Sequence, residues 1–152
     1  MKQNVKRLPY GIYDFEAVIE QNQYYVDKTM YLPLLENQPS NLFFIRPRRF
    51  GKSIFLSMLH AYYDCSKKEK FQTLFGDLWV GKHPTPLQGK YQVLHLDFSY
   101  VGGSIEKLEE NFDMYLRVKL DGFMRVYQEF YLADFKERFF KSDSGTEKLA
   151  LL

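Results

Sequence analysis

The sequence has little cysteine and no long apolar run. Cys65 is the single cysteine among 152 residues, which excludes an internal disulfide and a metal site built on cysteine ligands. No apolar run approaches the roughly 20 residues that a membrane-spanning helix needs, and the N-terminus has no signal-peptide core. These absences predict a cytoplasmic protein without a membrane partner.

The sequence also has little net charge. The 21 Lys and Arg residues against 19 Asp and Glu residues leave a net charge of +2, so the total charge does not itself imply nucleic acid as a partner. His60, His83 and His95 are scattered, and with one cysteine they give no metal-binding spacing. Aromatic residues are abundant, with 14 Phe and 12 Tyr, which predicts a core of rings or a large buried contact.

Hydrophobic periodicity predicts short helices and two apolar runs of strand length. Asp14 and Asp27 are expected to cap two short helices, and helical spacing returns at 53–63. The runs "LFFI" (42–45) and "YQVLHLDF" (91–98) favour buried strands. We therefore expect an α/β domain with parallel strands flanked by helices and a sheet that is incomplete in this chain.

The same pattern suggests how the chain is organised. Residues 1–40 are expected to form a helical segment before the first strand, and residues 41–152 part of the α/β core. A helical region should occupy 104–141, with Asp121-Gly122 as a joint between two helices.

The stretch "FFIRPRRFGKSIFL" (43–56) carries the chemistry. Gly51 lets the backbone approach a ligand, Lys52 supplies a point charge, and Ser53 offers a hydroxyl to Mg2+ at a helix start. The usual phosphate loop begins with a glycine that is separated by four residues from G-K-[ST]. Here that position is Arg46, and Pro47 restricts Arg46 to extended backbone.

Three arginines belong to this loop. Arg46, Arg48 and Arg49 can hold phosphate oxygens, because a guanidinium fork matches their geometry. Alternatively, they are solvated or pair with carboxylates such as Asp14 or Asp27. The sequence leaves both interpretations open.

Aromatic and basic residues before the loop have two interpretations. Tyr25 or Tyr31 could stack on a base, although core packing is favoured for both, and Lys28 could contact phosphate, although a surface lysine is favoured. The aromatic residues of 123–140 recur at helical spacing and are expected in a core.

Four stretches resemble the predicted AAA-ATPase-like family of bacteria and archaea, whose members are often fused to a PD-(D/E)xK nuclease-like domain. They are "LPYGIYDFEAVI", "YYVDKTMYLPLL", "FFIRPRRFGKSIFLSML" and "YQVLHLDFS", within about residues 8–141. In that family R-P-R-R-F-G-K-S is the Walker A loop, so Arg46 matches the family's own form. The resemblance implies an α/β domain of the phosphate-loop NTPase type, with residues 41–152 as the N-terminal portion of its core. It also implies that ATP is bound with Mg2+ on Ser53. The implied nucleotide-binding residues are Arg46, Pro47, Arg48, Arg49, Phe50, Gly51, Lys52, Ser53 and Ile54.

The acidic strand of the family, its Walker B element, has no counterpart in this sequence. Its form is L-I-D-E-Y-D at a strand end, and no Asp-Glu pair follows an apolar run in this sequence. Asp97 ends an apolar run and is a secondary candidate for the metal, with a capping or sheet-edge role preferred. We therefore expect a truncated, N-terminal part of a larger ATPase that binds nucleotide and hydrolyses little or none.

The partners of the chain stay partly open. The resemblance implies nucleic acid only through a fused nuclease-like domain, and self-association is left undecided. The alternative function is a non-catalytic module that binds nucleic acid or a protein through the arginine loop and the aromatic helices.

Overall fold

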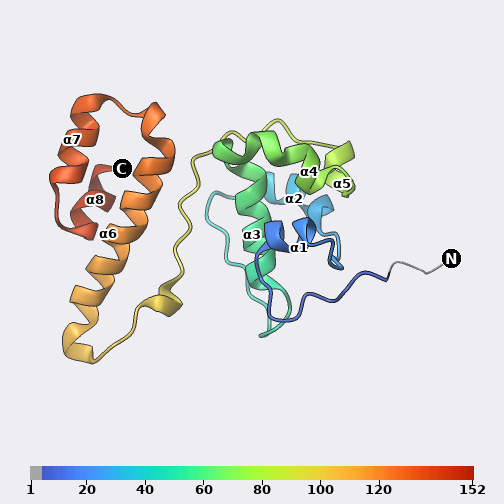
Figure 1. The fold of residues 1–152 in the computed structure, drawn as a ribbon, viewed down its shortest axis with the longest axis horizontal. Coiled ribbons are helices and arrows are strands. Elements are labelled where there is room, and N and C mark those ends of the chain that lie inside the picture. Colours follow the sequence, from blue (N-terminus) through green and yellow to red (C-terminus); the bar gives the residue numbers. More distant parts are fainter. Residues whose placement is uncertain (1–4) are drawn as a thin grey trace. The chain divides into compact units, whose positions relative to one another are not determined.

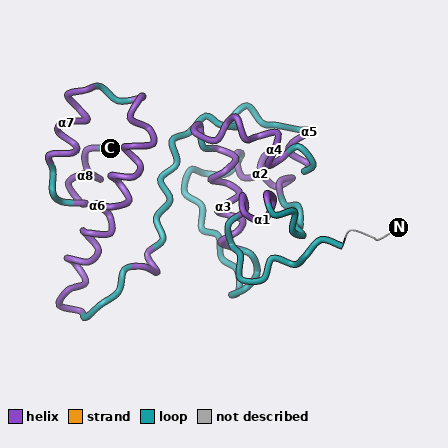
Figure 2. Tube along the Cα trace, in the orientation of Figure 1, coloured by secondary structure: helices purple, strands orange, loops and turns teal. Residues whose placement is uncertain are grey.

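The computed structural model describes residues 5–152 and divides the chain into two compact units, one ending at Tyr91 and the other beginning at Gln92. Both units are built from helices joined by loops (Figures 1 and 2). None of the helices in the described range is both long and apolar enough to cross a membrane. The expected boundary between 1–40 and 41–152 stays a prediction.

From residue 5 to Tyr91, the first unit contains five α-helices and two short 3-10 helices. They are α1 (Phe15–Glu20), η1 (Thr29–Tyr31), α2 (Leu32–Glu36), α3 (Lys52–Tyr63), η2 (Cys65–Lys70), α4 (Phe71–Phe75) and α5 (Trp79–Lys82). Asp14 caps α1 by accepting a hydrogen bond from the backbone N–H of Glu16, as its sequence position predicts. The helix predicted at 53–63 is confirmed as α3.

Aromatic rings form the core of this unit, between α1, α3 and α4. The rings of Phe15 and Phe75 stack at 5.0 Å, and the ring of Tyr62 meets Phe75 edge-on at 5.5 Å. All three side chains are inaccessible to solvent. Ring pairs of this geometry add to the burial of their area, which fixes α3 against the N-terminal helices.

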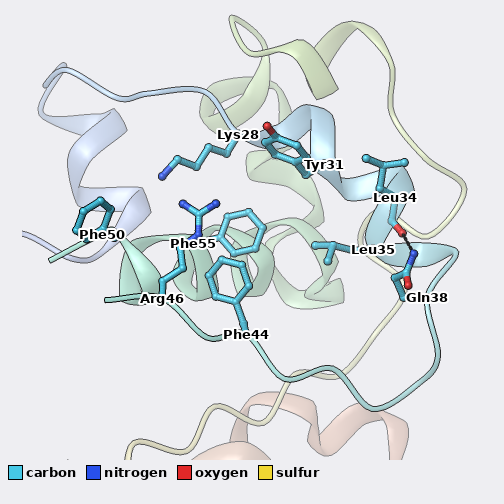
Figure 3. Close-up of a pocket in the computed structure, with 10 residues that line it drawn as sticks. Lys28, Tyr31, Leu34, Leu35, Gln38, Phe44, Arg46, Phe50 and Phe55 are labelled. Atoms are coloured by element: carbon cyan, nitrogen blue, oxygen red, sulfur yellow. Dashed lines mark hydrogen bonds between the residues drawn. The ribbon is translucent and has the colours of Figure 1, made fainter. Parts of the chain in front are cut away.

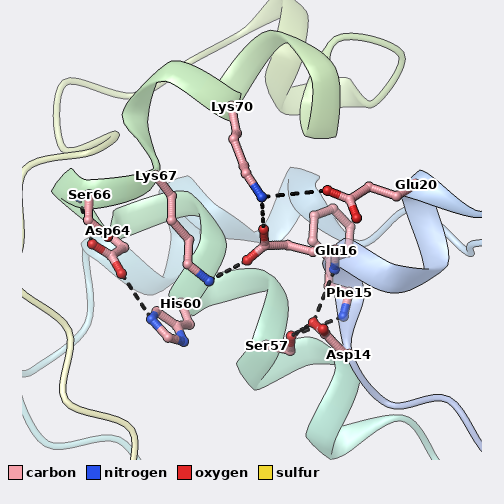
Figure 4. A network of polar contacts seen from close by, with 10 residues as sticks. All are labelled: Asp14, Phe15, Glu16, Glu20, Ser57, His60, Asp64, Ser66, Lys67 and Lys70. Carbon is pink, nitrogen blue, oxygen red and sulfur yellow. Dashed lines mark hydrogen bonds and ion pairs between the residues drawn. The ribbon is translucent and has the colours of Figure 1, made fainter. Parts of the chain in front are cut away.

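Polar contacts also tie α1 to α3 and η2 (Figure 4). The Ser57 hydroxyl on α3 donates to Asp14 at 2.9 Å and accepts from the backbone N–H of Phe15 at 3.0 Å. Lys67 and Lys70 both donate to the carboxylate of Glu16. Burial alone would raise the pKa of Glu16, but the hydrogen bonds and charges of these lysines lower it.

The second unit is organised around one long helix. Its elements are η3 (Phe98–Tyr100), η4 (Ile105–Lys107), α6 (Leu108–Tyr127), η5 (Gln128–Phe130), α7 (Ala133–Lys141) and α8 (Gly145–Leu151). Leu116, Leu120 and Met124 form a buried stripe on α6 and pack with Phe139 of α7. The helix runs unbroken through Asp121-Gly122, so the predicted joint there is wrong.

The predicted α/β fold with a parallel sheet is also wrong. Between residues 5 and 152 there is no strand, and the only ladder contact is an isolated parallel bridge between Asp64 and Tyr91. Residues 42–45 run extended, and Phe43 and Ile45 are 94% and 87% exposed. Without a neighbouring backbone to pair with, an apolar run of this length forms no strand.

The second apolar run is extended but lies along a helix. The backbone N–H groups of Val93 and Asp97 donate to the hydroxyls of Tyr127 and Tyr115 on α6, at 3.0 Å for Val93. Leu94 and Leu96 pack against the α6 core. Apolar side chains therefore alternate as in a strand, but two tyrosine hydroxyls, rather than the carbonyl groups of a partner strand, accept the hydrogen bonds of this segment.

Candidate functional site

The arginine-rich loop leads directly into α3. Gly51 is the N-cap residue and has φ 74°, and Arg49 has φ 67°, so both adopt left-handed backbone conformations. Glycine adopts this conformation without the steric cost of a Cβ atom. The loop thus makes two sharp turns before the helix begins at Lys52.

The start of α3 has no side-chain cap. Its first backbone bond joins the Phe55 N–H to the Gly51 carbonyl oxygen at 3.1 Å. The preceding N–H groups of Lys52, Ser53 and Ile54 have no backbone partner within residues 5–152. Three free donors and the positive end of the helix dipole together favour an anion at this position.

The Lys52 side chain closes the loop. Its ammonium group donates to the backbone carbonyl oxygen of Arg46, at the start of the loop, and to that of Pro47 at 3.2 Å. Two neutral acceptors hold the ammonium in place without neutralising its charge. The cation is therefore positioned in the loop and can still attract an anion.

The three loop arginines make no ion pair within the part of the chain that the structure describes. Asp14 bonds Ser57, and Asp27 bonds Thr29 and Trp79, so neither carboxylate neutralises an arginine. This outcome excludes the alternative that the arginines pair with Asp14 or Asp27. Contact of the arginines with phosphate stays a prediction.

A pocket of about 530 Å³ adjoins the loop at Gly51 (Figure 3). Its walls come from η1, α2, the extended run before the loop and α3. The lining residues are Lys28, Tyr31, Leu34, Leu35, Gln38, Phe44, Arg46, Phe50, Gly51 and Phe55. The rings of Phe44 and Phe55 stack at 5.0 Å and form an apolar wall. Two cations and no carboxylate line this pocket.

The two tyrosines considered for base stacking lie in different surroundings. Tyr25 packs into the core, where its ring meets Phe15 edge-on at 5.0 Å and burial raises the pKa of its hydroxyl. Tyr31 is half exposed and lines the pocket. Lys28 also lines the pocket, a placement that its sequence position alone did not reveal.

The remaining predicted site residues divide between the two units. Ser53 is exposed at the first turn of α3, Ile54 packs against the core, and Phe50 is largely exposed at the pocket edge. Asp97 lies in the second unit and caps η3 by accepting a hydrogen bond from the Ser99 N–H at 3.0 Å. A metal contact of Asp97 stays a prediction.

A left-handed glycine, a lysine and a hydroxyl at a helix start, with free N–H groups, are the arrangement that phosphate-loop proteins use. A family model described as "Predicted AAA-ATPase" matches residues 9–149, and the chain belongs to this family. An uncharacterized protein in the vnfD 5' region of Azotobacter chroococcum mcd 1 is 49% identical over 55 residues. That match covers 36% of this chain and 11% of the relative. No solved structure matches the chain.

Proposed function

We propose that this chain binds ATP with Mg2+ and holds the nucleotide phosphates at residues 46–53. The main support is the loop geometry, in which the Lys52 ammonium closes the loop beside the free N–H groups of α3. No carboxylate of the described residues competes for this charge. The family description supplies the ATPase class.

The residues present fit a magnesium ion that arrives with the phosphates. The Ser53 hydroxyl is exposed and has no hydrogen-bond partner among the described residues. Mg2+ prefers oxygen ligands and keeps several of its waters, so one protein hydroxyl and phosphate oxygens suffice for binding. Ser53 would hold the ion, and the ion would screen the phosphate charge.

The pocket beside Gly51 is suited to the base of the nucleotide. Tyr31 offers a half-exposed ring, and Leu35 and Phe44 add apolar surface. Ligand pockets commonly have an apolar lining with a few polar groups at one end. Here Lys28 and Arg46 are those polar groups, and Gly51 connects the pocket to the phosphate loop.

We expect binding without appreciable turnover. Hydrolysis needs an acidic group that positions water or metal, in addition to the phosphate cradle. No Asp-Glu pair follows an apolar run among the 152 residues. A phosphate-release assay on this chain should therefore stay at the level of a Lys52→Ala variant, and turnover that this variant abolishes would contradict the expectation.

Calorimetric titration with Mg-ATP tests the proposed function. Lys52→Ala should weaken binding by at least about tenfold, because a charge-assisted hydrogen bond contributes roughly 1.5–3 kcal/mol. Lys90→Ala is the matched control, since Lys90 is an exposed lysine in the same unit with no ion pair. A folded wild-type chain that does not bind Mg-ATP would overturn the proposal.

The exposed side of the loop favours a second candidate, nucleic acid binding without nucleotide. Phe43 and Ile45 are exposed beside Arg48 and Arg49, which make no ion pair in the described part of the chain. Such binding depends steeply on salt concentration, and Lys52→Ala would reduce the slope by about one charge. Saturable Mg-ATP binding that the variant loses would favour the first candidate.

A further inference from the structure

The side chain of Lys28 is aimed at the phosphate loop from outside it. Its ammonium nitrogen lies 3.4 Å from the position that a Cβ atom on Gly51 would occupy. Figure 3 shows Lys28 and Arg46 directed into the same space beside the loop. Lys28 is half-buried, and its ammonium group makes no hydrogen bond or ion pair within residues 5–152.

The residues on either side of Lys28 hold its backbone in place. Asp27 accepts hydrogen bonds from the Thr29 N–H at 2.8 Å and from the Trp79 N–H at 2.7 Å. The Thr29 hydroxyl donates to Asp27 at 2.7 Å and accepts from the Val80 N–H at 3.1 Å. These bonds occupy the first two N–H groups of α5 and fix both neighbours of Lys28.

The fixed backbone and the free ammonium suggest a role in binding. Asp27, the carboxylate adjacent to Lys28, is already engaged with Thr29 and α5. Lys28 and Arg46 therefore repel each other across the pocket mouth, and an anion placed between them would relieve that repulsion. The lining offers no carboxylate for this purpose, so an anionic ligand can take this position without displacing a protein group.

We propose that Lys28 is a second phosphate-binding cation, which contacts the nucleotide where the base pocket meets the loop. This inference rests on the proposed function of the loop. Because Lys28 lines the pocket and reaches Gly51, it contacts the phosphates nearest the ribose rather than the terminal one. It would then contribute equally to binding ATP and ADP, and Asp27 and Thr29 act as positioning residues.

Titration of Mg-ATP and Mg-ADP against the Lys28→Met variant tests this proposal. Methionine keeps the length of the aliphatic stem and removes the charge. We expect both affinities to fall by the same factor, on the order of tenfold. Lys28→Arg should retain most of the affinity, and Lys90→Met should bind as the wild type does. Lys28→Gln serves as a second neutral variant if methionine disturbs folding.

The outcomes separate this inference from the proposed function. If Lys52→Ala loses binding but both neutral Lys28 variants bind normally, the role of Lys28 is overturned and the loop still binds nucleotide. If only the ATP affinity falls, Lys28 contacts the terminal phosphate and its proposed position is wrong. If the folded wild-type chain binds neither nucleotide, both proposals fail.

Discussion

The Thr29 hydroxyl accepts a hydrogen bond from the backbone N–H of Val80 at 3.1 Å, in a position closed to solvent. The bond joins residues 51 positions apart in the sequence. It connects the segment that carries Lys28 to the start of α5. One buried hydroxyl therefore links the stability of the first unit to the geometry of the pocket.

Replacing Thr29 with valine should destabilise the first unit by about 2 kcal/mol. The two side chains have similar shapes, but valine leaves the Val80 N–H buried without a partner, which costs roughly 1–3 kcal/mol. Trp79 is the single tryptophan and lies next to this bond, so its fluorescence can follow urea unfolding. Thr29→Ser keeps the hydroxyl and should lower the free energy of unfolding by less than Thr29→Val does. Equal losses for valine and serine would rule out the hydrogen bond as the cause.

Gly51→Ala should destabilise the chain by about 1–2 kcal/mol and weaken Mg-ATP binding. The φ of 74° puts an alanine in the left-handed region, which costs roughly that amount. A Cβ atom would meet Lys28 and Ile54 at 3.4 and 3.5 Å, which is ordinary contact. Backbone strain, not collision, is therefore the expected cause.

Gly122→Ala is the matched control for the Gly51 variant. Gly122 lies in the interior of α6, and a Cβ atom there would meet nothing within 4 Å. Alanine should stabilise the helix by up to about 1 kcal/mol and leave Mg-ATP binding unchanged. Chemical denaturation and calorimetry on both variants check the two expectations. A stabilised Gly51→Ala variant would show that the left-handed turn is not required.

Local signals in the sequence predicted several of the helices correctly. The Asp14 cap and the start of α3 depend on residues within one turn of each other, so a short window contains the necessary information. The predicted cap by Asp27 is wrong, because Lys28 is the N-cap residue of η1 and Tyr31 that of α2, both without a side-chain cap, although Asp27 does accept a hydrogen bond from the Thr29 N–H. Gly122 misled the prediction because the buried stripe on α6 continues past it and outweighs its low helix propensity.

The strands and the wider site could not be predicted in this way, because both depend on distant partners. The run at 92–97 alternates as a strand does, but Tyr115 and Tyr127 on α6 take its N–H groups. Lys28 lies at the pocket because its neighbours Asp27 and Thr29 accept hydrogen bonds from α5, about 50 positions further along the chain. The stretch "YYVDKTMYLPLL" contains no local signal for these partners.

Asp113 should make the attachment of α8 dependent on pH. Its carboxylate accepts hydrogen bonds from the backbone N–H groups of Thr146 and Gly145, at 2.9 and 3.0 Å, and from the Ser144 hydroxyl. These bonds lower the pKa of Asp113 from 3.8 to about 2. A lowered pKa stabilises the folded state above the unfolded value, and this contribution disappears as the pH falls through about 2.

Amide hydrogen exchange at Gly145 and Thr146 can measure the Asp113 effect. Protection should be full above about pH 4 and decline as the pH falls toward 2, after correction for the intrinsic exchange rate. Asp113→Asn should reduce protection across the whole range and remove the acid dependence at these two amides. Asp143→Asn is the control, because Asp143 is exposed and bonds neither amide. An acid dependence that survives in Asp113→Asn would have to come from another group.

Removing the charge of Lys148 should strongly destabilise the second unit. Lys148 on α8 is 2% exposed, pairs with Asp121 on α6, and lies 5.0 Å from the centre of the Phe139 ring. Breaking a buried ion pair costs roughly 3–5 kcal/mol, but the Asp121 side chain is 25% exposed and can regain water. We therefore expect a loss of about 2 kcal/mol for Lys148→Met, measured by chemical denaturation with far-UV circular dichroism.

The loss in Lys148→Met should come mainly from the unpaired carboxylate that it leaves behind. If so, Asp121→Asn in the Lys148→Met background should recover part of the stability, although Asp121→Asn alone destabilises the wild type. The double-mutant cycle would then give a coupling energy within the range of about 0.5–3 kcal/mol that contacting residues show. Additive losses would instead mean that Lys148 stabilises α8 through its packing on Phe139 and Phe140.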